Sequence, residues 1–208
     1  MHYDVIAYVL IIDLLAIMSP GPDFFMVLRN SVTKSHKAGY YTALGISLGS
    51  TLVYFLGIFG IGLLVADNKY LFMGVKVAGC LYLSYLALRS IFSVATVEEP
   101  QLVYHDDGQG NINFGEYFRI GLWCNLANPK AFMFIVALST YIIKHGNPYT
   151  DGVVVVIGSF IATIVWFFLV ALIFGNVRIR KVFYRYQRVI NIAFGVILLY
   201  VAAQIIFL

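Results

Sequence analysis

Two proline-containing stretches decide the fold of this chain: Ser19-Pro20-Gly21-Pro22-Asp23-Phe24-Phe25 and Asn125-Leu126-Ala127-Asn128-Pro129-Lys130-Ala131-Phe132. Each stretch interrupts a long apolar segment and carries one charged residue. Because proline removes a backbone donor and displaces the carbonyl one turn earlier, such a break is stable in hydrocarbon only where protein buries it or a wet cavity adjoins it. Paired breaks at corresponding positions of two halves therefore indicate a transport site between the halves.

The composition places the chain in a membrane. Hydrophobic residues make up 61% of it and charged residues 12%, whereas soluble domains contain roughly 25% charged residues. The apolar residues form six segments, each near or above the ~20 residues of a spanning helix: 5–28 (broken), 41–66, 70–93, 114–143 (broken), 152–175 and 188–208. A cleaved signal peptide is the alternative for the first segment. The basic residues follow that segment instead of preceding it, which favours a retained helix.

The distribution of basic residues predicts the orientation. With six spans, ten of them fall on one side: Arg29, Lys34, Lys37, Arg89, Arg119, Arg178, Arg180, Lys181, Arg185 and Arg188. The other side has three: Lys69, Lys76 and Lys144. The positive-inside rule makes the first side cytoplasmic and puts both termini outside. This placement explains the net charge of +4 without a nucleic-acid partner, although the run from 178 to 188 could also contact anionic membrane lipid.

The chain divides into two halves. We expect a first three-helix repeat over 1–97, an acidic cytoplasmic linker over 98–116 and a second three-helix repeat over 117–208. An offset of 107 residues aligns the two breaks, and an odd number of spans per half inverts the second half relative to the first. The fold class predicted is thus an all-α membrane protein built as an inverted 3+3 repeat. In the second segment, the spacing of Gly45 and Gly49 favours close helix packing, with a homodimer contact as the alternative.

Three ionisable residues lie within the broken segments: Asp13, Asp23 and Lys130. At mid-membrane each uncompensated charge costs roughly 2.5 to 3.5 kcal/mol, so they should be paired, hydrated or functional. The 107-residue offset makes Asp23 and Lys130 equivalent, so an inverted fold brings them to one axis. A direct salt bridge between them is one interpretation. The other is that a zwitterionic amino acid places its ammonium on Asp23 and its carboxylate on Lys130. Asp13, seven residues before Pro20, is a candidate for proton coupling.

The remaining candidate binding residues surround the two prolines. Half-helices beginning near Pro22, after Gly21, and near Pro129 would present backbone amides to a carboxylate. Asn125 and Asn128 add neutral hydrogen-bonding groups, and Asn128 could instead only cap the half-helix that Pro129 starts.

Other classes of function have weaker support. Cys80 and Cys124 could form a membrane thiol-disulfide carrier, but they do not form a Cys-x-x-Cys motif. A metal exporter is also an alternative, but all four histidines lie at the terminus or in predicted loops, so the spans offer no imidazole ligand. No hydrolase or phosphate-loop motif occurs, so neither an enzyme nor a bound cofactor or metal is expected.

The runs from Ser19 to Phe25 and from Asn125 to Ala131 resemble the signatures of the lysine exporter superfamily, and the chain is most similar to its homoserine and threonine efflux branch. The resemblance covers essentially the whole chain. It implies efflux of small neutral amino acids, such as threonine or homoserine, across the bacterial inner membrane by antiport with protons.

Overall fold

The computed structural model describes residues 1–62, 68–92 and 112–207, and the regular structure in this part is helical. The elements follow in the order α1 (Tyr3–Met18), α2 (Pro22–Thr33), α3 (His36–Phe55), a π-helical turn (Leu56–Gly62), α5 (Lys69–Phe92), α6 (Phe114–Leu126), α7 (Pro129–His145), α8 (Thr150–Ile173) and α9 (Val177–Phe207).

The described helices provide up to six membrane spans. Four are long and apolar enough to cross a membrane individually, and two bent pairs could each form one more span. The first pair, α1 and α2, bends by 52°, and the second pair, α6 and α7, bends by 60°. The prediction of six segments with breaks in the first and fourth is therefore confirmed.

The two bends have the same local cause. Chain direction changes after Met18 and after Leu126, and each following half-helix starts with a proline as its first residue. Proline suits this position because its missing N–H would lack a helical partner there anyway. Each bent pair is thus two helices with a short connection, which is extended at Ser19 and Gly21 in the first pair and consists of a turn at Ala127 followed by extended Asn128 in the second.

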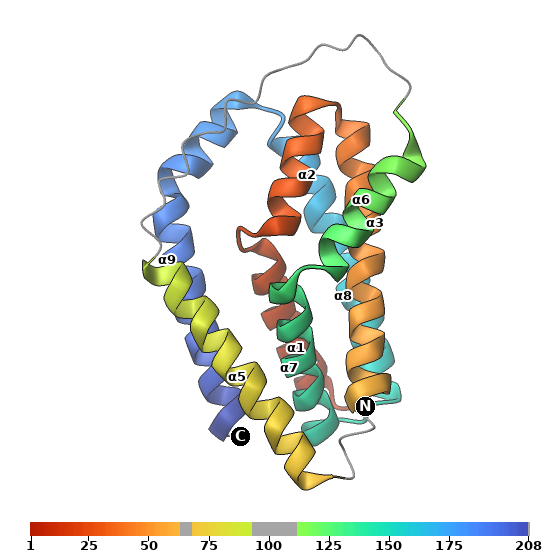
Figure 1. Cartoon of the computed structure of the whole chain (residues 1–208), viewed down its shortest axis with the longest axis vertical. Helices are drawn as coiled ribbons and strands as arrows, with labels where there is room; N and C mark the ends of the chain where they lie inside the picture. The colour runs from red at the N-terminus through yellow and green to blue at the C-terminus, as the bar shows by residue number, and fades with distance from the viewer. Residues whose placement is uncertain (63–67, 93–111, 208) are drawn as a thin grey trace.

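The two halves run in opposite directions (Figure 1). From the N-terminus, α1 and α2 rise toward the upper end of the molecule, whereas α6 and α7 descend from it. The main contacts between the halves pair helices of the first half with helices of the second. Helix α3 packs on α6 and α8, α1 packs on α8, and α5 packs on α9. Both termini lie toward the lower end in Figure 1, and the two breaks meet near mid-height.

Glycines allow the closest helix contact, between α3 and α6. A Cβ atom added to Gly45 would collide with the carbonyl oxygen of Phe118, and one added to Gly121 would collide with that of Thr42. At Gly49 an added Cβ would lie 2.9 Å from the side-chain oxygen of Asn125. The spacing of Gly45 and Gly49 therefore serves close packing within the chain, and it brings the second break against α3.

Several ends of the described helices differ from the predicted segments, and the largest difference is at the start of α9. Helix α9 begins at Val177, 11 residues before the predicted segment at 188, because hydropathy marks the hydrocarbon boundary and a basic helix can continue beyond it. The end of α3 continues as the π-helical turn, which hydropathy does not reveal. Most of the acidic linker predicted over 98–116 lies outside the described residues, and its last three residues belong to α6.

Candidate functional site

Asp23, the second residue of α2, holds the two breaks together. Its Oδ2 accepts hydrogen bonds from Asn125 Nδ2 at 2.9 Å and from Asn128 Nδ2 at 3.1 Å. Asn125 is the penultimate residue of α6, and Asn128 precedes α7. One carboxylate of the first half therefore binds both asparagines of the second half.

Asn128 has two roles at once. Its side-chain oxygen accepts from the backbone N–H of Lys130 at 3.0 Å and so caps α7, while its amide group donates to Asp23. The equivalent position in the first half is Gly21, which offers no side-chain cap to α2. The first backbone N–H groups of α2 consequently have no cap of this kind, whereas α7 is capped.

Lys130 reaches back across the break. Its ammonium group donates a hydrogen bond to the hydroxyl of Ser19, which follows α1, and lies 4.6 Å from the ring centre of Phe194 on α9. No ion pair joins Lys130 to Asp23 in the part of the chain that the structure describes. The direct pair considered from the sequence is thus not formed, because each charge has neutral hydrogen-bonding partners closer at hand.

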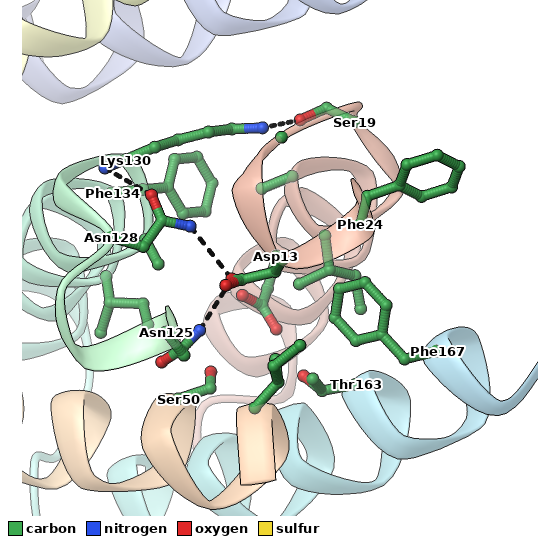
Figure 2. Close-up of a pocket in the computed structure, with 17 residues that line it drawn as sticks. Asp13, Ser19, Phe24, Ser50, Asn125, Asn128, Lys130, Phe134, Thr163 and Phe167 are labelled. Atoms are coloured by element: carbon green, nitrogen blue, oxygen red, sulfur yellow. Dashed lines mark hydrogen bonds between the residues drawn. The ribbon is translucent and has the colours of Figure 1, made fainter. Parts of the chain in front are cut away.

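These groups line a pocket between the breaks and helices α3 and α8. In Figure 2, Lys130 and Ser19 lie on one side of the pocket, and Ser50 and Thr163 lie on the other. Asp13, Asp23 and Asn125 also line it. We call this space the inner pocket.

A second, more open pocket adjoins the first. It lies between the breaks and the pair α5 and α9, with Arg89, Gln187 and Phe194 among its lining residues. Gly21 and Lys130 line both pockets, as does Asn128. The Lys130–Ser19 hydrogen bond therefore stands near the boundary of the two spaces. We call this second space the outer pocket.

The two prolines contribute differently from the charged residues. Pro22 and Pro129 are exposed and line the outer pocket, but neither lines the inner one. They set the start and direction of α2 and α7, and their neighbours Asp23 and Lys130 reach the inner pocket. From the sequence we predicted all these residues as substrate-binding residues, and in the structure Pro22 and Pro129 line only the outer pocket, whereas Asp23 and Lys130 line the inner one.

Asp13 lies in the same pocket and is 2% exposed. Its Oδ1 accepts from the hydroxyl of Tyr54 on α3 at 2.7 Å, and its Oδ2 accepts from the hydroxyl of Ser159 on α8 at 2.7 Å. Both carboxylate oxygens thus have neutral donors and no ion-pair partner among the described residues.

Three polar atoms of the inner pocket are buried and have no hydrogen-bond partner: Asp23 Oδ1, Asn125 Oδ1 and Thr163 Oγ1. Buried polar groups are nearly always hydrogen-bonded, so unpartnered ones beside a cavity are completed by water or by a ligand in that cavity. The first two atoms accept hydrogen bonds, and Lys130 donates them. The pocket can therefore hold a small molecule that carries a donor group and an acceptor group close together.

Sequence reasoning missed several of these residues as site residues: Ser19, Ser50, Tyr54, Ser159 and Thr163. A signal existed for two of them. Ser159 and Thr163 are four residues apart, so they share one helix face in an otherwise apolar segment. Hydroxyls at that spacing favour a polar stripe toward protein. Ser19 stood in the first break, but nothing in the sequence identifies it as the partner of Lys130.

The structure also shows where the residues of the two alternative functions lie, which are a thiol-disulfide carrier and a metal exporter. Cys80 lies on α5 and Cys124 on α6, and both are free thiols. Cys124 lies next to Asp23. Among the described residues, no three His, Cys, Asp or Glu side chains gather as metal ligands would.

Comparisons with known proteins identify the family of this chain. The chain is 25% identical over 189 residues to the uncharacterized membrane protein YahN of Escherichia coli (strain K12), covering 91% of this chain and 83% of YahN. It is 31% identical over 134 residues to the leucine efflux proteins of Salmonella typhimurium (strain LT2) and Salmonella typhi, covering 64% of this chain. That match covers 61% of the leucine efflux proteins, less than two thirds of their length. No solved structure matches the chain significantly. The LysE type translocator family model matches residues 14–208, and the chain belongs to this family.

Proposed function

We propose that this chain is a secondary exporter of small neutral amino acids, threonine and homoserine among them, in the bacterial inner membrane and coupled to protons. One observation carries the proposal: Asp23 and Lys130 reach the same pocket from two equivalent breaks, and each binds neutral partners instead of the other. The names of the leucine efflux relatives support amino acids as the substrate class.

The polar end of the inner pocket fits the two charges of an amino acid. The ammonium group would donate to Asp23 Oδ1 and Asn125 Oδ1, which are both acceptors without partners. The carboxylate would bind Lys130 in place of the Ser19 hydroxyl, assisted by the uncapped first amides of α2. Because these groups are already positioned by the two breaks, binding needs only the exchange of neutral partners for charged ones.

The two adjoining pockets suggest the path by which a substrate reaches the site. The outer pocket includes Arg89, near the end of α5, and Gln187, in the basic first third of α9. By the positive-inside rule this half of the molecule is cytoplasmic and the termini are outside. A substrate would therefore enter the outer pocket from the cytoplasm, replace Ser19 on Lys130 and move into the inner pocket.

Asp13 is the candidate for proton coupling. It is a buried carboxyl group that lines the same pocket as Asp23 but binds only the hydroxyls of Tyr54 and Ser159. Intramembrane carboxyl groups of this kind serve as proton relays in transporters. Binding of a proton at Asp13 and of an ammonium group in the same pocket would disfavour each other, which is the requirement for exchange.

The test is counterflow of labelled amino acids in proteoliposomes. Asp23→Asn and Lys130→Gln should each weaken uptake roughly ten- to hundredfold, since each removes a charge-assisted hydrogen bond of about 1.5 to 3 kcal/mol. The matched control is Lys76→Gln, because Lys76 is also buried within a span but lines neither pocket. Unchanged transport in both site variants, or an equal loss in the control, would refute the proposed site.

Coupling needs a separate measurement. Asp13→Asn should retain counterflow, which requires no net proton movement, but should lose the accumulation driven by an imposed pH gradient. If accumulation persists in this variant, the coupling group lies elsewhere.

The cysteines distinguish the leading alternative. A thiol-disulfide carrier would lose all function when Cys80 and Cys124 are both changed to serine. The proposed exporter should keep its transport in this double variant, apart from a modest effect of Cys124 through its neighbour Asp23.

A further inference from the structure

Hydroxyl groups inside the described helices mostly bond their own helix. Six of them donate to a carbonyl three or four residues earlier, at 2.7 to 2.8 Å: Thr33, Thr42, Ser47, Thr51, Ser139 and Thr140. This bond is the ordinary way for Ser and Thr to satisfy a hydroxyl within a helix.

Thr163 on α8 departs from this pattern. It is 1% exposed, and its hydroxyl has no hydrogen-bond partner although the carbonyl of Ser159 lies one turn earlier. The residue lines the inner pocket, and Figure 2 shows it on the side opposite Lys130 and Asn128. An unpartnered, buried hydroxyl beside a cavity is costly unless something in the cavity completes it.

The nearby carboxylate of Asp13 does not use the Thr163 hydroxyl as a hydrogen-bond donor. Each oxygen of Asp13 already accepts a hydroxyl hydrogen bond at 2.7 Å, one from Tyr54 and one from Ser159. The hydroxyl of Ser50 lies on the same side of the pocket, and the neighbouring lining residues Ile46 and Phe167 are apolar. Thr163 is therefore a hydrogen-bonding group beside apolar lining residues, across the pocket from the charged end.

We propose that Thr163 is a specificity-determining residue that hydrogen-bonds a hydroxyl group on the substrate side chain. The inference rests on the proposed function, in which the breaks bind the ammonium and carboxylate groups. Those contacts turn the side chain of the substrate toward α3 and α8, where Thr163 lies. A hydroxyl on that side chain forms a hydrogen bond with the Thr163 hydroxyl. An aliphatic side chain of equal size leaves the Thr163 hydroxyl without a hydrogen-bond partner.

Competition between threonine and valine tests this inference, because their side chains have nearly the same shape and differ by a hydroxyl against a methyl. In proteoliposomes, the wild-type protein should prefer threonine over valine, and Thr163→Val should lower the ratio of their apparent affinities roughly three- to tenfold, the effect of one neutral hydrogen bond. Thr163→Ser should keep the wild-type ratio. Thr140→Val is the matched control, since Thr140 is buried but bonds its own helix and lies outside the inner pocket.

The outcomes separate the inference from the proposed function. If Asp23→Asn abolishes transport but Thr163→Val leaves the ratio unchanged, Thr163 does not determine specificity and the exporter proposal stands. If the wild-type protein transports no amino acid, both fail. If Thr163→Val does not insert stably, Thr163→Ala removes the same hydroxyl without adding an atom, and an unchanged ratio in that variant overturns the inference equally.

Discussion

Gly45→Ala should weaken the contact that holds the second break against α3. The added Cβ would meet the carbonyl oxygen of Phe118 and lie 2.7 Å from the backbone nitrogen of Leu122, whereas ordinary contacts begin at 3.4 Å. These are backbone atoms of α6, so they cannot rotate away as a side chain could. The two helices must therefore separate by more than about half an ångström.

Two effects of opposite sign determine the change in stability of Gly45→Ala. Alanine stabilises a helix interior by roughly 0.5 to 1 kcal/mol relative to glycine, and overpacking of a tight contact costs roughly 1 to 3 kcal/mol. The clash should prevail here because it involves backbone, which gives a net loss of about 1 kcal/mol or more. The matched control is Gly74→Ala on α5, where an added Cβ has nothing within 4 Å. Gly74→Ala should therefore show only the stabilisation that alanine gives a helix relative to glycine.

Thermal unfolding of the purified protein in one detergent, followed by tryptophan fluorescence, should move the midpoint down for Gly45→Ala and up for Gly74→Ala. Separation of the helices should also displace Asn125, which packs on Gly49, so that Gly45→Ala weakens amino-acid binding as well. Equal midpoints in the two variants, or a more stable Gly45→Ala, would show that α3 and α6 do not make this close contact.

Three further changes address the site and the outer end. Asn128→Asp keeps an acceptor to cap α7 but sets a second carboxylate beside Asp23, so counterflow should weaken at least tenfold by like-charge repulsion, and an unaltered rate would contradict the geometry. Ser19→Ala removes the neutral competitor for the lysine, so apparent substrate affinity should rise a few-fold, and a fall would show that the hydroxyl assists binding. His2→Ala removes the partner at 2.7 Å from fully buried Asp151, so the unfolding midpoint should fall by the equivalent of about 1 kcal/mol, since His2 is half exposed.

The sequence was sufficient for the parts of the site that depend on the chain's periodicity. The two proline breaks, their equivalence under the offset of 107 and the placement of Asp23 and Lys130 near one axis all follow from spacing and from the number of spans. These features survive any choice of side-chain rotamer, so they can be predicted without coordinates.

The hydrogen-bond partners could not be predicted in this way. Tyr54 and Ser159 are 41 and 146 residues from Asp13, and only the packing of α1, α3 and α8 brings their hydroxyls to its carboxylate. The choice of Ser19 over Asp23 as the partner of Lys130 likewise depends on a few ångströms of side-chain reach. Spacing along the chain contains no information at that scale.

The separation of Asp23 from Lys130 has a functional consequence that a double-mutant cycle can measure. Breaking a buried ion pair by removing one partner costs roughly 3 to 5 kcal/mol, so a direct pair would oppose any substrate that had to part it. Neutral partners on each charge are exchanged at lower cost, roughly 1.5 to 3 kcal/mol per hydrogen bond to a charged group. In the substrate-free protein, the stability losses of Asp23→Asn and Lys130→Gln should therefore add in the double variant, with a coupling below about 1 kcal/mol. A coupling of several kcal/mol would mean that the two charges pair directly, and the substrate would then have to compete with that pair.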